Sequence, residues 1–185
     1  VGKSEAFEIA VQGLDDVHIP NPRQRMNDFP HQLSGGMRQR VMIAMALSCN
    51  PDLLIADEPT TALDVTTQAQ IMDLMAELTE GRDTAVMLIT HDLGVVAGFC
   101  NRIQVMYAGR LAETGTADDV FFHGKHPYTA GLLGSMTRMD EVRSERLFSI
   151  RGAPPSLINP PRGCRFRPRC DFADAGVCSK TPRLR

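Results

Sequence analysis

Two short apolar runs in this chain each end directly in polar residues, and no other feature limits the fold as much. The run LLIA at 53–56 is followed at once by Asp57 and Glu58, and the run AVMLIT at 85–90 is followed by His91. Short apolar runs of this kind are typical of strands buried on both faces of a parallel sheet. Helical patterns lie around them, so the sequence predicts an α/β domain.

The other expected elements surround these two strands. Apolar periodicity and turn signals indicate helices over 4–14, from Ser34 to Asn50-Pro51, over 65–79 and over 92–99, and a strand pair over 103–107 and 110–115 that turns at Ala108-Gly109. Five prolines make 152–170 unsuitable for a regular helix or a central strand. The expected architecture is a mainly parallel sheet flanked by helices, with an irregular extension after about residue 137.

Composition and charge exclude several classes of protein. The 185 residues are 43% hydrophobic and 23% charged, which suits one globular core with a tail. No apolar run reaches the roughly 18 residues that cross a bilayer, and the N-terminus lacks a secretory signal, so we expect a chain that is neither exported nor membrane-spanning by itself. Residues 151–185 carry a net charge of +6 and the first 150 residues carry −8, and this basic tail fits either an anionic partner or a solvated loop.

Asp57, Glu58 and His91 are candidate site residues because ligands of open parallel sheets bind beyond the carboxyl ends of the strands. Carboxylates at the rim of a core must be paired or metal-bound to offset their desolvation. An aspartate there suits Mg²⁺, and a glutamate beside it can polarise a water molecule for attack on phosphorus. A cap on the following turn is the simpler alternative for the two carboxylates.

The stretch LSGGMRQR at 33–40 adds a candidate anion site. Ser34 is a strong N-cap, and Gly35 and Gly36 leave the first backbone amides of the helix open to a phosphate. Glycine in a helix interior costs up to about 1 kcal/mol relative to alanine. Phosphate binding therefore explains the two glycines better than a plain helix start does.

Together these stretches resemble the nucleotide-binding domain of ATP-binding cassette (ABC) proteins, which has a P-loop NTPase-like fold. LSGGMRQR resembles its signature loop, LLIADE its Walker B strand, TALD at 61–64 its D-loop and ITHD at 89–92 its switch-histidine loop. In that family two domains close over two ATP molecules with Mg²⁺. Each ATP is held by the phosphate loop of one subunit and the signature loop of the other.

The resemblance assigns a role to each matching residue. It places Ser34, Gly35, Gly36 and Gln39 at the ATP of the partner subunit, Asp57 on Mg²⁺, Glu58 as general base, His91 on the γ-phosphate and Asp64 in communication across the dimer. Capping of the helix over 65–79 explains Asp64 equally well.

Gly2-Lys3-Ser4 matches the end of a phosphate loop G-x-x-x-x-G-K-[ST], but Lys3 stands only 31 positions before Ser34. In ABC domains the phosphate loop lies much farther upstream. We therefore expect a look-alike on the helix that leads to the signature loop. We also expect the C-terminal portion of a longer polypeptide, in which residues 1–185 alone hydrolyse little ATP.

The C-terminal stretches resemble one branch of the family. HPYTAGLL at 126–133, RGAPPSL at 151–157 and GCRFRPRC at 163–170 are similar to the extension of ATP-binding subunits in dipeptide and oligopeptide importers, a group that includes nickel importers. The resemblance implies part of a helical subdomain over 1–50, the C-terminal part of the ATPase core over 51–137 and the extension over 138–185.

That branch implies partners and a location. The chain would pair with an identical or paralogous ATPase subunit, bind two membrane permease subunits and act indirectly with an extracytoplasmic solute-binding protein. It would be a peripheral subunit at the cytoplasmic face of the inner membrane, with no nucleic acid partner. Two alternatives stay open: a non-transport ABC ATPase that acts on nucleic acid, suggested by the basic tail, and a redox-sensing iron–sulfur module.

The five cysteines fall into two groups. Cys49 and Cys100 stand alone in apolar stretches and are expected to be buried thiols. Cys164, Cys170 and Cys178 resemble ligands of a four-iron four-sulfur cluster found in some members of this branch, with a fourth ligand expected beyond the last residue given. The arginines between the first two of these would favour thiolates. Zinc or three reduced thiols are the alternatives.

Overall fold

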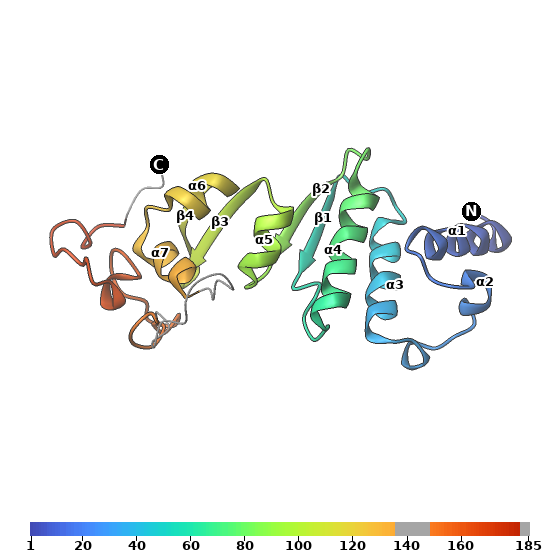
Figure 1. The fold of residues 1–185 in the computed structure, drawn as a ribbon, viewed down its shortest axis with the longest axis horizontal. Helices are drawn as coiled ribbons and strands as arrows, with labels where there is room; N and C mark the ends of the chain where they lie inside the picture. Colours follow the sequence, from blue (N-terminus) through green and yellow to red (C-terminus); the bar gives the residue numbers. More distant parts are fainter. Residues whose placement is uncertain (136–148, 182–185) are drawn as a thin grey trace. The chain divides into compact units, whose positions relative to one another are not determined.

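The computed structural model describes residues 1–135 and 149–181, and the chain forms two compact units (Figure 1). The first unit is Val1–Val95 and the second is Val96–Arg185. Within the described ranges, no helix is both long and apolar enough to cross a membrane. The expected division into 1–50, 51–137 and 138–185 stays a prediction.

The first unit begins with helices that precede its sheet. They are α1 (Lys3–Asp16), α2 (Pro22–Arg25), the 3-10 helix η1 (Pro30–Gln32) and α3 (Gly35–Leu47). α1 packs on both α2 and α3, and Leu14 and Ile43 are buried side chains of α1 and α3. The guanidinium of Arg40 donates to the Val17 carbonyl at 2.9 Å, so α3 is tied by a hydrogen bond to the residue that ends α1.

The sheet of the first unit is a parallel pair. β1 (Leu53–Asp57) and β2 (Ala85–Ile89) are joined by the crossover helix α4 (Val65–Thr79). The register pairs Asp57 with Ile89, so both strands end at the same edge. α4 contributes four buried side chains, Ile71, Met72, Leu74 and Met75. The two predicted strands, their parallel pairing and the helix over 65–79 are confirmed.

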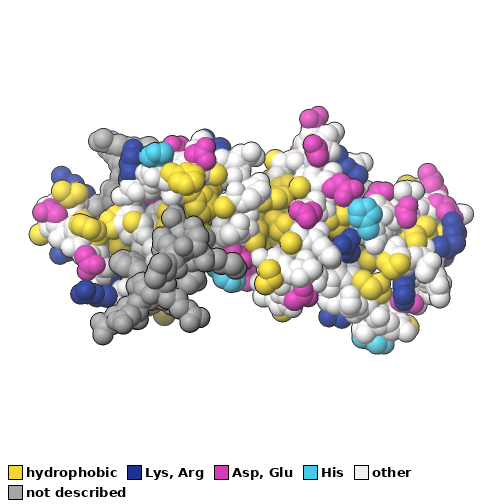
Figure 2. All heavy atoms as spheres, viewed as in Figure 1, with side chains coloured by type: hydrophobic (Ala, Val, Ile, Leu, Met, Phe, Trp, Pro, Cys, Tyr) yellow, Lys and Arg dark blue, Asp and Glu magenta, His cyan; other side chains and the backbone are white. Residues whose placement is uncertain are grey.

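The prediction that these strands are buried on both faces is wrong for the described residues. Leu54 and Ala56 are buried, but Ile55 is 58% exposed and Met87 is 50% exposed. Burial alternates along β1 because only one face of the pair is covered. Figure 2 shows hydrophobic side chains at the surface in this region.

The second unit is built on a β-hairpin. α5 (Leu93–Phe99) leads into β3 (Arg102–Tyr107) and β4 (Arg110–Thr116), which are antiparallel and turn at Ala108-Gly109 as predicted. Both turn residues have positive φ, which suits a two-residue hairpin turn. α6 (Ala117–His123), α7 (Pro127–Gly134) and the 3-10 helix η2 (Arg167–Arg169) follow. The core of this unit includes Val96, Ile103, Val105 and Val120.

The two isolated cysteines are less buried than predicted. Cys49 is exposed, because it follows the C-cap residue Ser48 of α3 and so lies beyond the buried part of that helix. Cys100 is half-buried against the core of the second unit, and burial raises the pKa of its thiol. The burial prediction is therefore wrong for Cys49 and holds only in part for Cys100.

Candidate functional site

Glu58 and His91 meet where β1 and β2 end. Glu58 directly follows β1, His91 comes two residues after β2, and Nδ1 of His91 lies 3.1 Å from Oε1 of Glu58. Both side chains face solvent, with 45% of the Glu58 side chain and 80% of the His91 side chain exposed. The sequence predicted only that these residues share a crevice, and the structure brings them into contact.

Two further hydrogen bonds fix Glu58. Its backbone N–H donates to the Ile89 carbonyl at 2.8 Å, and the Thr61 hydroxyl donates to its Oε2 at 2.7 Å. Its φ of 46° lies in the left-handed region, where non-glycine residues are uncommon and functional sites are over-represented. The hydrogen bonds from Thr61 and His91 lower the pKa of Glu58, so its carboxylate is ionised at neutral pH.

Asp57 is the last residue of β1 and carries an exposed carboxylate beside Glu58. Mg²⁺ takes one or two carboxylates and completes its shell with phosphate oxygens and water. An exposed carboxylate at a strand end fits that kind of ion. Across residues 1–135 and 149–181, no group of three His, Cys, Asp or Glu side chains is placed to hold a metal ion. Mg²⁺ at Asp57 would therefore need phosphate oxygens and water as its other ligands.

Ser34 caps the N-terminus of α3, as predicted. Its Oγ accepts the Met37 N–H at 3.2 Å. The guanidinium of Arg38 donates to the Leu33 carbonyl at 2.8 Å and so fixes the residue before the cap. Gln39 lies half-buried in the following turn of α3.

The two glycines after Ser34 also have a packing role that sequence reasoning missed. A Cβ atom on Gly36 would lie 2.8 Å from Cγ2 of Thr67, and one on Gly35 would lie 3.4 Å from Cδ2 of Leu63. α3 therefore begins against the 61–64 loop and the first turn of α4. Glycine at these two positions permits the close packing and also leaves the backbone amides open.

The first turn of α4 carries two hydrogen-bonded side chains. Asp64 caps the helix, because its Oδ1 accepts the Thr67 N–H at 2.9 Å and its Oδ2 accepts the Thr67 hydroxyl at 2.7 Å. Nε2 of Gln68 donates to Oδ2 of Asp92 at 2.8 Å, which lowers the pKa of Asp92. Sequence reasoning missed Gln68, because it belongs to none of the recognised motifs and its partner lies 24 positions away.

The extension brings its cysteines close together without completing a metal site. The Cys164 N–H donates to the Cys178 carbonyl at 3.1 Å, and Gly163 has no room for a side chain against that carbonyl. Burial raises the pKa of Cys170, and the neighbouring Cys178 and Cys164 raise it further. No set of three metal-binding side chains is formed in the part of the chain that the structure describes. The three thiols therefore do not fit a closed cluster site as they stand.

The predicted stabilisation of thiolates by arginine is wrong for Cys170, because neighbouring arginines bind other groups. Arg165 donates to the Ala108 carbonyl, and Arg169 donates to the Tyr107 hydroxyl at 3.2 Å. Both acceptors belong to the β3–β4 hairpin or its turn. Two cations of the basic tail thus hold the extension to the hairpin.

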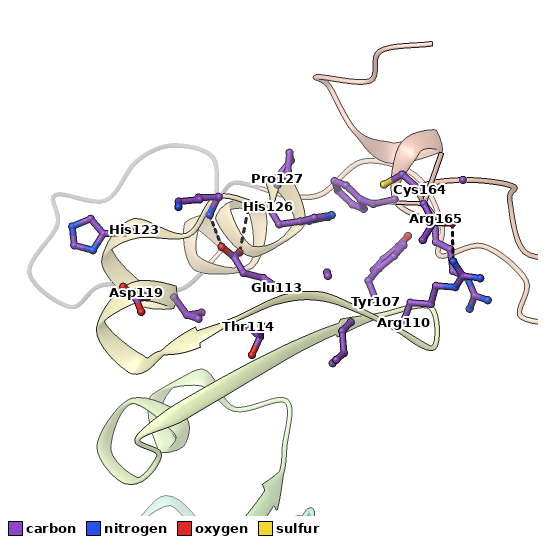
Figure 3. Close-up of a pocket in the computed structure, with 17 residues that line it drawn as sticks. Tyr107, Arg110, Glu113, Thr114, Asp119, His123, His126, Pro127, Cys164 and Arg165 are labelled. Atoms are coloured by element: carbon purple, nitrogen blue, oxygen red, sulfur yellow. Dashed lines mark hydrogen bonds between the residues drawn. The ribbon is translucent and has the colours of Figure 1, made fainter. Parts of the chain in front are cut away.

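A pocket of about 500 Å³ lies among β4, α6, α7 and residues 163–166 (Figure 3). The Glu113 carboxylate accepts the Lys125 N–H at 2.6 Å and the His126 N–H at 3.2 Å (Figure 3). Burial opposes the ionised form of Glu113, but these backbone N–H groups outweigh it and lower its pKa. Glu113 thereby fixes the start of α7.

Phe166 packs the extension onto the second unit. It is only 4% exposed, and its ring centroid lies 5.2 Å from that of Tyr107 and 5.5 Å from that of Tyr128. The stretches at 126–133 and 163–170 therefore form one folded region with the hairpin.

Two family models match parts of this chain. The family model described as "ABC transporter" matches residues 3–61, and the one described as "Oligopeptide/dipeptide transporter, C-terminal region" matches residues 112–178. The oligopeptide transport ATP-binding protein OppD of Salmonella typhimurium is 56% identical over 184 residues, which is 100% of this chain and 54% of that protein. The dipeptide transport ATP-binding protein DppD of Bacillus subtilis is 55% identical over 92% of this chain and 50% of its own length. The chain thus spans about half the length of the curated relatives it matches.

Solved structures give the same fold. A dimeric structure of MJ0796, described as a bacterial ABC transporter cassette, is 36% identical with a TM-score of 0.54 and covers 63% of this chain and 49% of that one. The structure of cbiO1 from Clostridium perfringens, described as part of the ABC transporter complex cbiONQ, is 32% identical with a TM-score of 0.57. It covers 65% of this chain and 47% of that one.

Proposed function

Because this chain belongs to the ABC transporter ATP-binding family and carries the oligopeptide/dipeptide transporter C-terminal region, we propose that it supplies the catalytic strand ends of an ATP-hydrolysing subunit that drives peptide import. The contact of Glu58 with His91, beside Asp57, carries this proposal. An ionised carboxylate and a histidine at the carboxyl ends of parallel strands suit attack of water on a phosphate.

Each residue at this edge has a proposed role. Asp57 holds Mg²⁺, which offsets negative charge on the phosphates when it is bound. Glu58 is ionised and accepts a proton from the attacking water. His91 orients the Glu58 carboxylate through its Nδ1 and leaves its other ring nitrogen for the γ-phosphate.

The signature-like stretch has a proposed role in trans. The first amides of α3, at Gly35 and Gly36 after the Ser34 cap, bind the ATP of a second ATPase subunit, which is identical or paralogous. Gln39 lies near that nucleotide, and Asp64 adds communication across the dimer to its role as a cap. The MJ0796 cassette, whose solved structure is described as dimeric, supports this arrangement.

The proposal also covers the assembly of a whole importer. The ATPase pair binds two permease subunits and lies peripherally at the cytoplasmic face of the membrane, and a solute-binding protein acts with the permeases. The matches to OppD and DppD, which are named for oligopeptide and dipeptide transport, support peptides as the solute. The nucleic acid alternative rests on the basic tail, but two arginines of that tail donate hydrogen bonds to the hairpin and its turn.

An iron–sulfur cluster on Cys164, Cys170 and Cys178 stays a proposal, and no step of the reaction depends on it. The proximity of the three thiols supports it, and the lack of a three-ligand metal site among the described residues counts against it. Iron and sulfide analysis of anaerobically purified protein tests it. Colourless protein without iron would reject the cluster, and zinc in its place would assign the thiols to that metal.

A chimera tests the ATPase function. The part of Salmonella typhimurium OppD that this chain does not span is joined to residues 1–185, which align with 54% of that protein at 56% identity. We expect Mg²⁺-dependent ATP hydrolysis and restored peptide uptake in cells that lack their own OppD. Glu58→Gln should lower turnover by about 10²-fold or more, the usual contribution of a general base.

The matched control is Glu80→Gln, the same change at an exposed residue that follows α4. It should leave turnover unchanged. A chimera that hydrolyses ATP equally well with Glu58→Gln would reject the proposed role of Glu58. An active chimera that binds DNA in a salt-sensitive way and restores no uptake would favour the nucleic acid alternative.

A further inference from the structure

We propose that Gln68 is a positioning residue that holds His91 against Glu58 by fixing Asp92. The role of Gln68 in catalysis rests on the proposed function, but the contacts that carry the proposal are independent of that function. They run from the first turn of α4 to the end of β2 and lie wholly within the first unit.

The first step is the bond between Gln68 and Asp92. Nε2 of Gln68 lies 2.8 Å from Oδ2 of Asp92, and the contact is partly buried. A hydrogen bond from a neutral donor to a carboxylate is stronger than one between neutral groups. Because α4 is a well-packed helix with four buried side chains, its Gln68 is a fixed donor.

The second step is the hold of Asp92 on the first turn of α5. Its other oxygen, Oδ1, accepts the Gly94 N–H at 2.9 Å and the Val95 N–H at 3.4 Å. Its own N–H donates to the Thr90 hydroxyl at 3.0 Å. The residues on both sides of His91 are therefore held, and Asp92 is the group through which α4 reaches them.

The third step is the exposure of His91 itself. Its side chain is 80% exposed, and its ring has one hydrogen-bonded partner within the described ranges, the Glu58 carboxylate. With so little packing around the ring, its direction depends on the backbone of residues 90–92. Loss of the Gln68 donor should therefore loosen the His91–Glu58 contact.

The same turn of α4 also faces α3. Thr67 bonds to Asp64 and touches the position of Gly36, and Gln68 follows it directly. A shift of the 61–64 loop would thus reach both the start of α3 and the loop that carries His91. One turn of α4 therefore contacts α3 at Gly36 and, through Asp92, the loop that carries His91.

Nuclear magnetic resonance of the ¹⁵N-histidine-labelled 185-residue chain tests the proposal. The ionised Glu58 carboxylate is an acceptor, so the His91 tautomer with the proton on Nδ1 should dominate in neutral imidazole. Gln68→Ala should shift the His91 signals toward the mixed tautomers of a free imidazole. Gln68→Glu keeps the size of the side chain but removes the donor at neutral pH. It should therefore shift the His91 signals in the same direction.

Gln70→Ala is the matched control, because it makes the same change at an exposed position two residues farther along α4. Its His91 signals should match those of the unchanged chain. The proposal is wrong if Gln68→Ala and Gln70→Ala give the same His91 spectrum. It is also wrong if Gln68→Glu retains the Nδ1 tautomer, because packing alone would then hold the ring.

The chimera separates this inference from the proposed function. In an active chimera, Gln68→Ala should lower kcat about tenfold, or about 1.4 kcal/mol in the barrier, and change KM for ATP little. An unchanged kcat together with a large effect of Glu58→Gln would reject the positioning role of Gln68 and leave the proposed function in place. If Glu58→Gln has no effect, the proposed function is wrong, and the His91 spectrum still tests the positioning role of Gln68.

Discussion

Gly36 and Thr67 are in such close contact that a Cβ atom on the glycine would lie 2.8 Å from Cγ2 of the threonine. The start of α3 and the first turn of α4 therefore meet without space for a methyl group. This contact explains why a residue with poor helix propensity stands near the start of α3. It also joins the signature-like stretch to the helix capped by Asp64.

Gly36→Ala should destabilise the first unit by about 1–3 kcal/mol, the usual cost of overpacking. Urea unfolding followed by circular dichroism measures the change. Thr67→Ser removes Cγ2 but keeps the hydroxyl that bonds Asp64, so the double variant should recover most of the loss. Gly13→Ala is the control, because its Cβ would meet only the Ala44 Cβ at 4.0 Å. An equal loss in both single variants would contradict the steric explanation.

Glu113 should make the second unit sensitive to acid. Its pKa is lower in the folded chain than in the unfolded chain, so its contribution is present above about pH 4.3 and is lost as pH falls through the folded-state pKa. Glu113→Gln should lower stability at pH 7 by about 1–2 kcal/mol and flatten the acid dependence. Thermal unfolding at pH 7 and at pH 3.5 measures both effects. Asp171→Asn, at an exposed residue, should leave the pH dependence of the unchanged chain intact.

The elements that sequence predicted well are those with a strong local signal. The helix over 65–79 has an Asp64 cap and clear periodicity, and its predicted bounds agree with α4. The proximity of Glu58 and His91 followed from a rule of topology, because parallel neighbours end at one edge. Neither prediction needed knowledge of side-chain packing.

The failures have two causes: local capping signals that were overlooked, and contacts between distant segments that the sequence does not show. α6 and α7 were missed, although Thr116 and Asp119 form a capping box and His126 caps the helix that starts at Pro127. Cys49 was predicted buried from its apolar neighbours, but it lies beyond the end of α3. The Gln68–Asp92 bond has no local signal at all, because it exists only once α4 lies beside the end of β2.

Phe166 should anchor the extension. It is buried between Tyr107 and Tyr128, so Phe166→Ala should cost about 3–5 kcal/mol, the usual range for a buried aromatic. Limited trypsin digestion followed by mass spectrometry should show faster cleavage within residues 149–181. Phe172→Ala is the matched control, because Phe172 is 80% exposed and should change neither stability nor cleavage. Equal digestion of both variants would mean that the aromatic contacts do not hold the extension.

Cys49 and Cys100 should differ in their reaction with a thiol reagent in the folded chain. Cys49 is exposed, whereas Cys100 is half-buried with a raised pKa, so less of its thiol is accessible and less is ionised at pH 7.5. With a limiting maleimide reagent, peptide mass spectrometry should find Cys49 modified first and Cys100 much later. In urea the two rates should converge, because the protection of Cys100 comes from the packing of α5 against Ile103 and Val120. Faster modification of Cys100 in the folded chain would contradict the placement of both residues.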